Sequence, residues 1–299
     1  MRKFIAALLI IILIMFLIVV GLLISKCSPA TDADPTTAPS AQLSLETPGG
    51  GAAPATDNPT SEPTAEALPT EQPTPDYSGI PRAVTEGTLD DVFARLEQLK
   101  TLPEEAVIIL LDVGHGGFDG GSVGVDTGAH EADLNLEVSR VLAEKLAEKG
   151  YYVFMTRMGD YALDQTKNGD MKKRTEIMKL DIFDVSVSIH MNSFPQDRSV
   201  KGARVYHYER GTESERLAEI VMRSICTANG TNYRSTITED LMVVREPIAP
   251  SILVECGFIS HPEEELNLKS PQYQNLLSQA IADGVESFLR GDAGVTTGN

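Results

Sequence analysis

Residues 105–291 of this chain are predicted to form a single α/β domain with a largely parallel sheet flanked by helices. Short runs rich in Val, Ile and Leu alternate with amphipathic segments of 10–18 residues, as strands alternate with helices in such folds. The apolar runs are nearly continuous, as expected for strands buried on both faces of a parallel sheet. The span suits one hydrophobic core, and no internal repeat divides it.

The first elements are assigned from apolar spacing and from the residues that end each pattern. A lead-in segment, 87–104, is expected to hold one short amphipathic helix that Pro103 ends. Residues 107–113 form an apolar run broken by Asp112, which is typical of a buried strand. A glycine-rich loop, 114–128, follows this strand.

The middle of the domain continues the alternation. Residues 133–149 repeat apolar side chains on one helical face, and Gly150 closes that helix. Residues 151–156 are expected to form the second strand, and 171–180 the next helix. In 184–190, Val and Ile alternate with polar residues, which is the period of a strand.

The last third of the domain adds the remaining elements. Residues 203–208 are expected to form a strand and 213–228 a helix. The short apolar runs 241–244 and 251–256 are both assigned as strands, and a helix over 272–289 closes the domain.

The chain ahead of this domain differs from it in kind. An uncharged apolar run, 4–24, is long enough to cross a bilayer core of roughly 30 Å. Arg2 and Lys3 precede the run, so we expect a cytoplasmic stub (1–3), a membrane anchor (4–25) and an exported remainder. The alternative is a cleaved signal peptide, although its apolar region is usually shorter, and cleavage would release a secreted protein.

Residues 26–86 read as an acidic linker rich in Pro, Thr, Ser and Ala. From Cys27 to Pro81 there are 11 of the 17 prolines and no Lys or Arg. Without apolar periodicity the segment cannot offset its ordering entropy by burial, so we expect it to be disordered. A lipoprotein signal ending at Cys27 is disfavoured because Lys26 stands where a small residue is needed. A flexible tail is expected at 292–299.

Charge and cysteine content limit the function classes. The chain has 25 basic and 43 acidic residues, a net charge of −18. Binding to nucleic-acid phosphates needs clustered Lys and Arg, so nucleic-acid binding is not expected. Cys226 and Cys256 lie in apolar periodic segments, and we expect them to be core residues rather than a bridge or a nucleophile.

Four polar residues stand where an α/β sheet gathers its ligand sites. His115 follows the first predicted strand, His190 ends a later one, and Glu255 ends the apolar run of the last. Glu131 stands where the loop after His115 meets the next helix. Ligand sites collect at the carboxyl ends of parallel strands, so these four side chains can converge.

Two imidazoles, one carboxylate and an open position match a catalytic zinc site, and a second carboxylate can deprotonate a metal-bound water. The alternative, that each residue is satisfied locally, is disfavoured by four polar groups at matching strand ends. The glycine-rich segment lacks the Gly-Lys-Ser/Thr of a P-loop, and Asp119 replaces the third glycine of the dinucleotide fingerprint. No Gly-x-Ser-x-Gly elbow occurs, so a serine hydrolase is not indicated.

Four motifs follow one another along the domain: DVGHGGFDGGSVG (112–124), EADLNL (131–136), SIHMNS (188–193) and PSILVECGFIS (250–260). In this order they resemble the motifs of the zinc-dependent N-acetylmuramoyl-L-alanine amidases of the amidase-3 type. The resemblance covers about residues 105 to 290 and implies a catalytic domain with a six-stranded sheet. It also implies one zinc ion (Zn2+) on His115, Glu131 and His190, with Glu255 as the catalytic carboxylate.

The activity implied is hydrolysis of the amide bond between N-acetylmuramic acid and the L-alanine of the peptidoglycan stem peptide. Four more residues are candidates for contacts with substrate or with a metal ligand: Asn192, Arg245, Asp119 and His261. His261 stands where the family often has Asn, and Arg245 has a surface ion pair as its alternative role.

Two other functions remain open from the sequence. One is a zinc peptidase that cuts within the stem peptide, and the other is a catalytically silent wall-binding module. Both an uncleaved anchor and a cleaved signal peptide place the domain outside the cytoplasm, next to peptidoglycan, and the anchor would tether it to the membrane. The sequence names no protein regulator.

Overall fold

The computed structural model describes residues 77–291; the predicted stub, anchor and tail and most of the linker lie outside the described residues. The strands are β1 Ile108–Val113, β2 Tyr152–Met155, β3 Val185–Asn192, β4 Arg204–His207, β5 Ile237–Thr238 and β6 Ser251–Phe258. The helices are α2 Leu89–Leu99, α3 Glu131–Glu148, α4 Lys167–Met178, α5 Glu213–Ala228, α6 Met242–Arg245, α7 Pro262–Leu268 and α8 Pro271–Leu289. Within the described part, no helix combines the length and the apolar character needed to span a bilayer.

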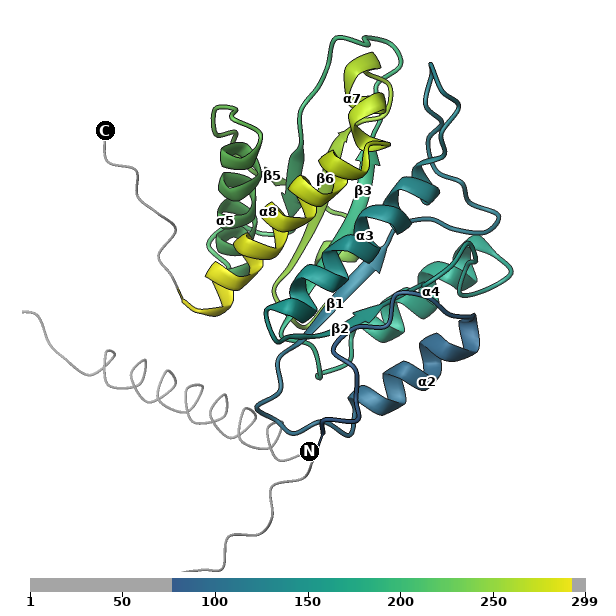
Figure 1. The fold of residues 1–299 in the computed structure, drawn as a ribbon, viewed down its shortest axis with the longest axis vertical. Helices are drawn as coiled ribbons and strands as arrows, with labels where there is room; N and C mark the ends of the chain where they lie inside the picture. The colour runs from purple at the N-terminus through teal and green to yellow at the C-terminus, as the bar shows by residue number, and fades with distance from the viewer. Residues whose placement is uncertain (1–76, 292–299) are drawn as a thin grey trace, which may run out of the picture. The chain divides into compact units, whose positions relative to one another are not determined.

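The six strands form one sheet in the order β2-β1-β3-β6-β4-β5 (Figure 1). The pairs β1–β2, β1–β3 and β3–β6 are parallel, whereas β4 runs antiparallel to β6 and parallel to β5. The predicted six-stranded, largely parallel sheet is therefore confirmed. All six residues of β1 are buried, because helices cover both faces of the sheet at its centre.

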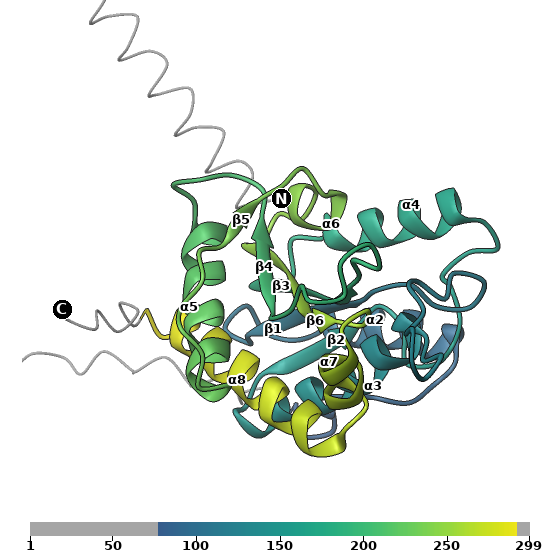
Figure 2. The ribbon, with the colours of Figure 1, turned by 90° about the horizontal axis from the view of Figure 1, so that it is seen from above.

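The helices divide between the two faces of the sheet. Helices α3, α5 and α8 lie on one face, with α8 packed against both of the others, and α4 and α6 lie on the opposite face (Figure 2). Cys226 of α5 and Cys256 of β6 are free, buried thiols, as predicted. Helices thus cover both faces of the central strands. The carboxyl ends of these strands and the loops that follow them are the parts that can form a site.

The predicted strand at 241–244 is wrong, because Met242–Arg245 form the one-turn helix α6. The amides of Val244 and Arg245 both donate to the carbonyl of Leu241, which closes the turn. Four consecutive apolar residues carry no periodicity that separates a strand from a buried helical turn. The sixth strand is instead the two-residue β5.

Helix α7 was not predicted from the sequence. His261 caps this helix by accepting a hydrogen bond from the amide of Glu264 at 3.3 Å, and Pro262 occupies the first turn. Three consecutive glutamates follow in that turn. A cap, an early proline and acidic residues in the first turn form a recognisable helix start, so the signal was present in the sequence.

Residues 77–86, which the sequence assigned to the linker, contact the domain. Ile80, Ala83 and Val84 pack against the core, and the carbonyl of Arg82 accepts a hydrogen bond from the amide of Val153 at 2.7 Å. The ordered domain thus begins ahead of α2.

Candidate active site

The carboxyl ends of β1, β3 and β6 bring the predicted residues together. His190 of β3 and Glu255 of β6 are register partners on adjacent strands. His115 lies two residues after β1, and Glu131 is the first residue of α3. One ligand atom from each of His115, Glu131 and His190 lies within 4.8 Å of the others, which is close enough for a shared metal ion.

Glu131 lies at the centre of this cluster. Its Oε1 is 3.2 Å from Nε2 of His115 and 3.0 Å from Nδ1 of His190. The backbone amides of Met191 and Ser122 donate to its two oxygens, at 3.2 and 2.8 Å. Burial alone would raise the pKa of Glu131, but the hydrogen bonds with His115 and His190 outweigh it and hold the pKa well below its usual value. Glu131 is therefore an ionised carboxylate, as a metal ligand must be.

The glycine-rich loop lets the backbone and side chains approach closely. A Cβ on Gly114 would lie 2.4 Å from the His190 ring, and a Cβ on Gly121 would lie 2.7 Å from Oε2 of Glu131. His115 itself has φ +59°, a left-handed conformation that is unfavourable for a residue with a side chain. Such strain costs on the order of 1–3 kcal/mol and persists only where the surroundings enforce it.

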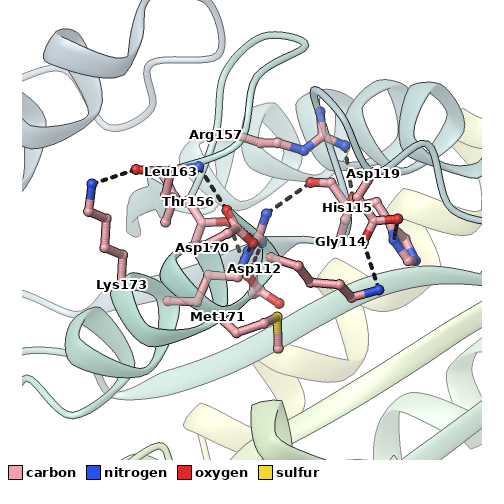
Figure 3. Close-up of polar contacts among 12 residues, drawn as sticks. Asp112, Gly114, His115, Asp119, Thr156, Arg157, Leu163, Asp170, Met171 and Lys173 are labelled. Atoms are coloured by element: carbon pink, nitrogen blue, oxygen red, sulfur yellow. Dashed lines mark hydrogen bonds and ion pairs between the residues drawn. The ribbon is translucent and has the colours of Figure 1, made fainter. Parts of the chain in front are cut away.

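Asp119 sits behind His115 (Figure 3). Its Oδ1 is 3.1 Å from Nδ1 of His115, the ring nitrogen that does not face Glu131. Its Oδ2 is 3.2 Å from the ammonium of Lys167, an exposed side chain at the start of α4. A carboxylate on the far nitrogen fixes the tautomer and the ring orientation of a histidine ligand.

Glu255 differs from Glu131, because one of its carboxylate oxygens is buried without a hydrogen-bond partner. Its Oε2 is shielded from solvent and has no hydrogen-bond partner. Burial raises the pKa of Glu255 to about 7, against the opposing effect of His190. A carboxyl group with a pKa near neutrality can both accept and donate a proton at ordinary pH.

The cluster opens into a recess of about 440 Å3. Asn192 lines it together with Asp119 and Glu255, and the amide of Ser193 donates to Oδ1 of Asn192 at 2.8 Å. The other two candidates are not among its lining residues. Arg245 pairs with Asp240 and Glu246, and the ring of His261 caps α7.

One residue that lines the recess and one that holds the neighbouring loop were not singled out in the sequence. Lys167 lines the recess, and its side chain is 71 % exposed. Glu265 of α7 is fully buried and accepts hydrogen bonds from the amides of Asp126 and Thr127, at 2.9 and 2.7 Å. It thereby ties α7 to the loop that leads into Glu131. The start signals of α4 and α7, namely a capping residue and a polar first turn, could have pointed to both.

The three clustered residues suit a metal ion by their chemistry. Two imidazole nitrogens and one ionised carboxylate form a donor set that borderline divalent metals prefer, and the recess leaves one side open. The unpartnered Oε2 of Glu255 provides a buried polar atom beside this donor set. The residues present therefore fit a metal ion with an open coordination position.

Comparison with known proteins establishes the family to which the chain belongs. The model of the family Amidase_3, described as N-acetylmuramoyl-L-alanine amidase, matches residues 109–287. The chain belongs to the N-acetylmuramoyl-L-alanine amidase family. The predicted family and its amidase activity on peptidoglycan are thus confirmed, and the match spans all four converging residues.

Members of this family agree with the chain in sequence and in fold. The germination-specific N-acetylmuramoyl-L-alanine amidase of Bacillus subtilis is 30% identical over 198 residues, which cover 63% of this chain and 82% of that protein. The CwlD amidase of Clostridioides difficile, solved with the GerS lipoprotein, has a TM-score of 0.59 at 29% identity, covering 62% of this chain and 100% of that one. The catalytic domain of CwlV from Bacillus (Paenibacillus) polymyxa has a TM-score of 0.56 at 28% identity, covering 62% and 98%.

Proposed function

We propose that His115, Glu131 and His190 hold one zinc ion and that Glu255 moves the proton in hydrolysis of the amide between N-acetylmuramic acid and L-alanine. The observation that carries the proposal is the contrast between two adjacent carboxylates. Glu131 accepts hydrogen bonds on both oxygens, whereas Oε2 of Glu255 has none. The first arrangement suits a metal ligand and the second suits a group that exchanges protons.

When bound, zinc supplies a Lewis acid that polarises the scissile carbonyl and makes water more acidic. Glu255 accepts a proton from the attacking water and returns one to the nitrogen of the leaving L-alanine. Burial raises the pKa of Glu255 to about 7 in the zinc-free protein, and a bound cation would lower it toward the ionised form that accepts a proton. The contact between Asp119 and Nδ1 of His115 supports an orienting role for Asp119, and the place of Asn192 in the lining of the recess supports a contact with substrate.

The reaction is tested by the products formed from purified cell wall. Mass spectrometry should find stem peptides with a free L-alanine amino terminus, and a chelator should abolish their release. Cleavage at another bond of the stem peptide would identify a zinc peptidase instead. Binding to the wall without any cleavage would identify a silent binding module.

We also propose that residues 4–25 anchor the chain in the membrane and that residues 26–86 carry the catalytic domain away from it. Peptidoglycan lies outside the cytoplasm, which agrees with an exported domain and with the uncharged apolar run near the N-terminus. Fractionation of cells producing the full chain tests this: the protein should stay with the membrane after a salt wash. Recovery of a shortened protein from the medium would support a cleaved signal peptide.

A protein partner is a further part of the proposal. The Clostridioides difficile relative was solved with a lipoprotein bound, which supports such a partner for this chain as well. Co-purification of the full chain from its native cells, followed by mass spectrometry, tests it. Recovery of the chain alone after mild cross-linking would argue against a stable partner.

A further inference from the structure

His115 is the one non-glycine residue with positive φ among residues 77–291. The left-handed backbone conformation of His115 gives its imidazole a direction that the usual conformations with negative φ would not give. Because the conformation is unfavourable, neighbouring groups must hold it in place. The hydrogen bonds to the backbone around His115 show which groups these are.

Two buried arginines hold three successive carbonyls at this point. Arg174 of α4 donates to the carbonyls of Val113 and His115, at 2.8 and 2.9 Å. Arg157, which follows β2, donates to the carbonyl of Val113 at 3.2 Å. It also donates to the carbonyl of Gly114 at 2.9 Å (Figure 3). Both side chains are at most 2% exposed. The backbone that carries His115 is thus held from the side of α4 and from the end of β2.

Arg174 is itself held by two carboxylates. Its Nη1 is 2.6 Å from Oδ1 of Asp112, and its Nε is 2.8 Å from Oδ2 of Asp170. Asp112 in turn accepts hydrogen bonds from Ser188 of β3, at 2.7 Å, and Thr156 after β2, at 3.1 Å. These two ion pairs fix the orientation of the Arg174 guanidinium. A fixed guanidinium can hold a carbonyl oxygen in a defined position.

Arg157 connects His115 to the helix that bears Glu131. Its Nη2 donates to the carbonyl of Gly114 and also to that of Ala132, at 2.6 Å. Ala132 directly follows Glu131 at the start of α3. One planar group thus sets the spacing between the segments that carry His115 and Glu131.

We propose that Arg174 and Arg157 are positioning residues that preset His115, and the spacing of His115 to Glu131, for metal binding. The proposal rests on the proposed role of His115 as a zinc ligand. Neither arginine lines the recess, so both act through the backbone and not on the substrate. Their loss should weaken zinc binding beyond any loss of stability, because misplacing a ligand costs affinity.

The test compares Arg174→Lys and Arg157→Lys with Arg95→Lys in the full-length protein. Arg95 is a matched control, since it is buried and donates to the carbonyls of Pro81, Arg82 and Val153, away from His115. Zinc affinity is measured by competition with a chromophoric chelator, the cobalt-substituted protein by its visible spectrum, and the zinc-free protein by thermal unfolding. We expect all three variants to lose stability. Only Arg174→Lys and Arg157→Lys should bind zinc about 10- to 100-fold more weakly and change the cobalt spectrum.

The proposal is overturned if the two variants bind zinc no more weakly than Arg95→Lys. If Arg174→Lys does not fold, Arg157→Lys decides, because the hydrogen-bond acceptors of Arg157 are carbonyls and no carboxylate loses its partner. His115→Ala separates this inference from the proposed function. Unchanged zinc content in His115→Ala would reject the metal centre itself. Zinc lost there but bound normally by both arginine variants would reject only the positioning role.

Discussion

The start of α3, which carries Glu131, and strand β6, which carries Glu255, place two carboxylates beside the same histidines in opposite surroundings. Around Glu131, backbone amides and two imidazoles satisfy both oxygens and lower the pKa. Around Glu255, burial raises the pKa to about 7 and one oxygen has no partner. Neighbouring acids whose pKa values are driven apart mark a division of roles. This contrast supports the proposed roles, in which Glu131 holds the cation and Glu255 moves the proton.

Among substitutions that remove one of the two carboxylate roles, Glu255→Gln is expected to have the largest effect on the rate of hydrolysis. The amide keeps the shape of the side chain but cannot take a proton, so kcat should fall about 100- to 10,000-fold. The measurement is the rate of stem-peptide release from purified wall, with zinc content determined on the same sample. Normal turnover by a zinc-loaded Glu255→Gln protein would remove Glu255 from the mechanism.

Gly121→Ala tests the crowded surroundings of Glu131. A Cβ there would lie 2.7 Å from Oε2 of Glu131 and 2.9 Å from the His115 ring, at φ +68°. Gly128→Ala is the matched control, because Gly128 has φ +70° in the same loop but nothing within 4 Å of its Cβ. Both should destabilise the protein by about 1–3 kcal/mol through backbone strain. In zinc titrations only Gly121→Ala should lose affinity, and equal affinity in the two variants would contradict a tightly packed centre.

Asp119→Asn tests the support behind His115. The amide cannot act as a charged acceptor for Nδ1, so zinc affinity should fall about tenfold, near the lower end for such supporting partners. Lys167→Met removes another partner of Asp119 and should have a smaller effect, since the Lys167 side chain is largely exposed. Chelator competition on both variants measures this order. A larger loss in Lys167→Met would show that Lys167 matters for another reason.

A separate effect is expected on the pH dependence of stability in zinc-free protein. Glu255 has a folded pKa of about 7, raised from 4.5. Between these pH values the unfolded chain has released a proton that the native protein keeps, so stability falls as pH rises. Glu255→Gln lacks this fall, which should amount to about 1–3 kcal/mol for a shift of this size. Urea unfolding at pH 4.5 and pH 8 measures it, and parallel curves for the two proteins would contradict the raised pKa.

Much of the fold followed from the sequence because buried parallel strands are continuous apolar runs. The strand ending at Val113 and the strand that contains His190 were recognisable in this way, and the polar residues at their carboxyl ends indicated the site. The strand predicted at 241–244 failed because so short a run carries no period. Helix α7 was missed although its cap and early proline were visible in the sequence.

The candidate metal ligands and the candidate catalytic carboxylate could be predicted from their residue types and their positions after strands. The contacts around them could not. Nothing in the spacing of Arg157 and Arg174 tells that they share the carbonyl of Val113, since that contact depends on how α4 and β2 lie across the sheet. Nor does the sequence separate Glu131 from Glu255 by environment, because each pKa depends on hydrogen bonds and burial that appear only in the folded chain. Lys167 beside Asp119 was missed for the same reason.

The most direct test of the division between the two carboxylates is the zinc content of Glu131→Gln and Glu255→Gln, prepared side by side. Each change replaces one carboxylate oxygen by an amide nitrogen and leaves the side-chain shape intact. After dialysis against buffered zinc, Glu255→Gln should retain about one zinc per chain, as the wild type should, and be inactive. Glu131→Gln should lose most of its zinc. Wild-type zinc content in Glu131→Gln, or loss of zinc from Glu255→Gln, would contradict the assignment.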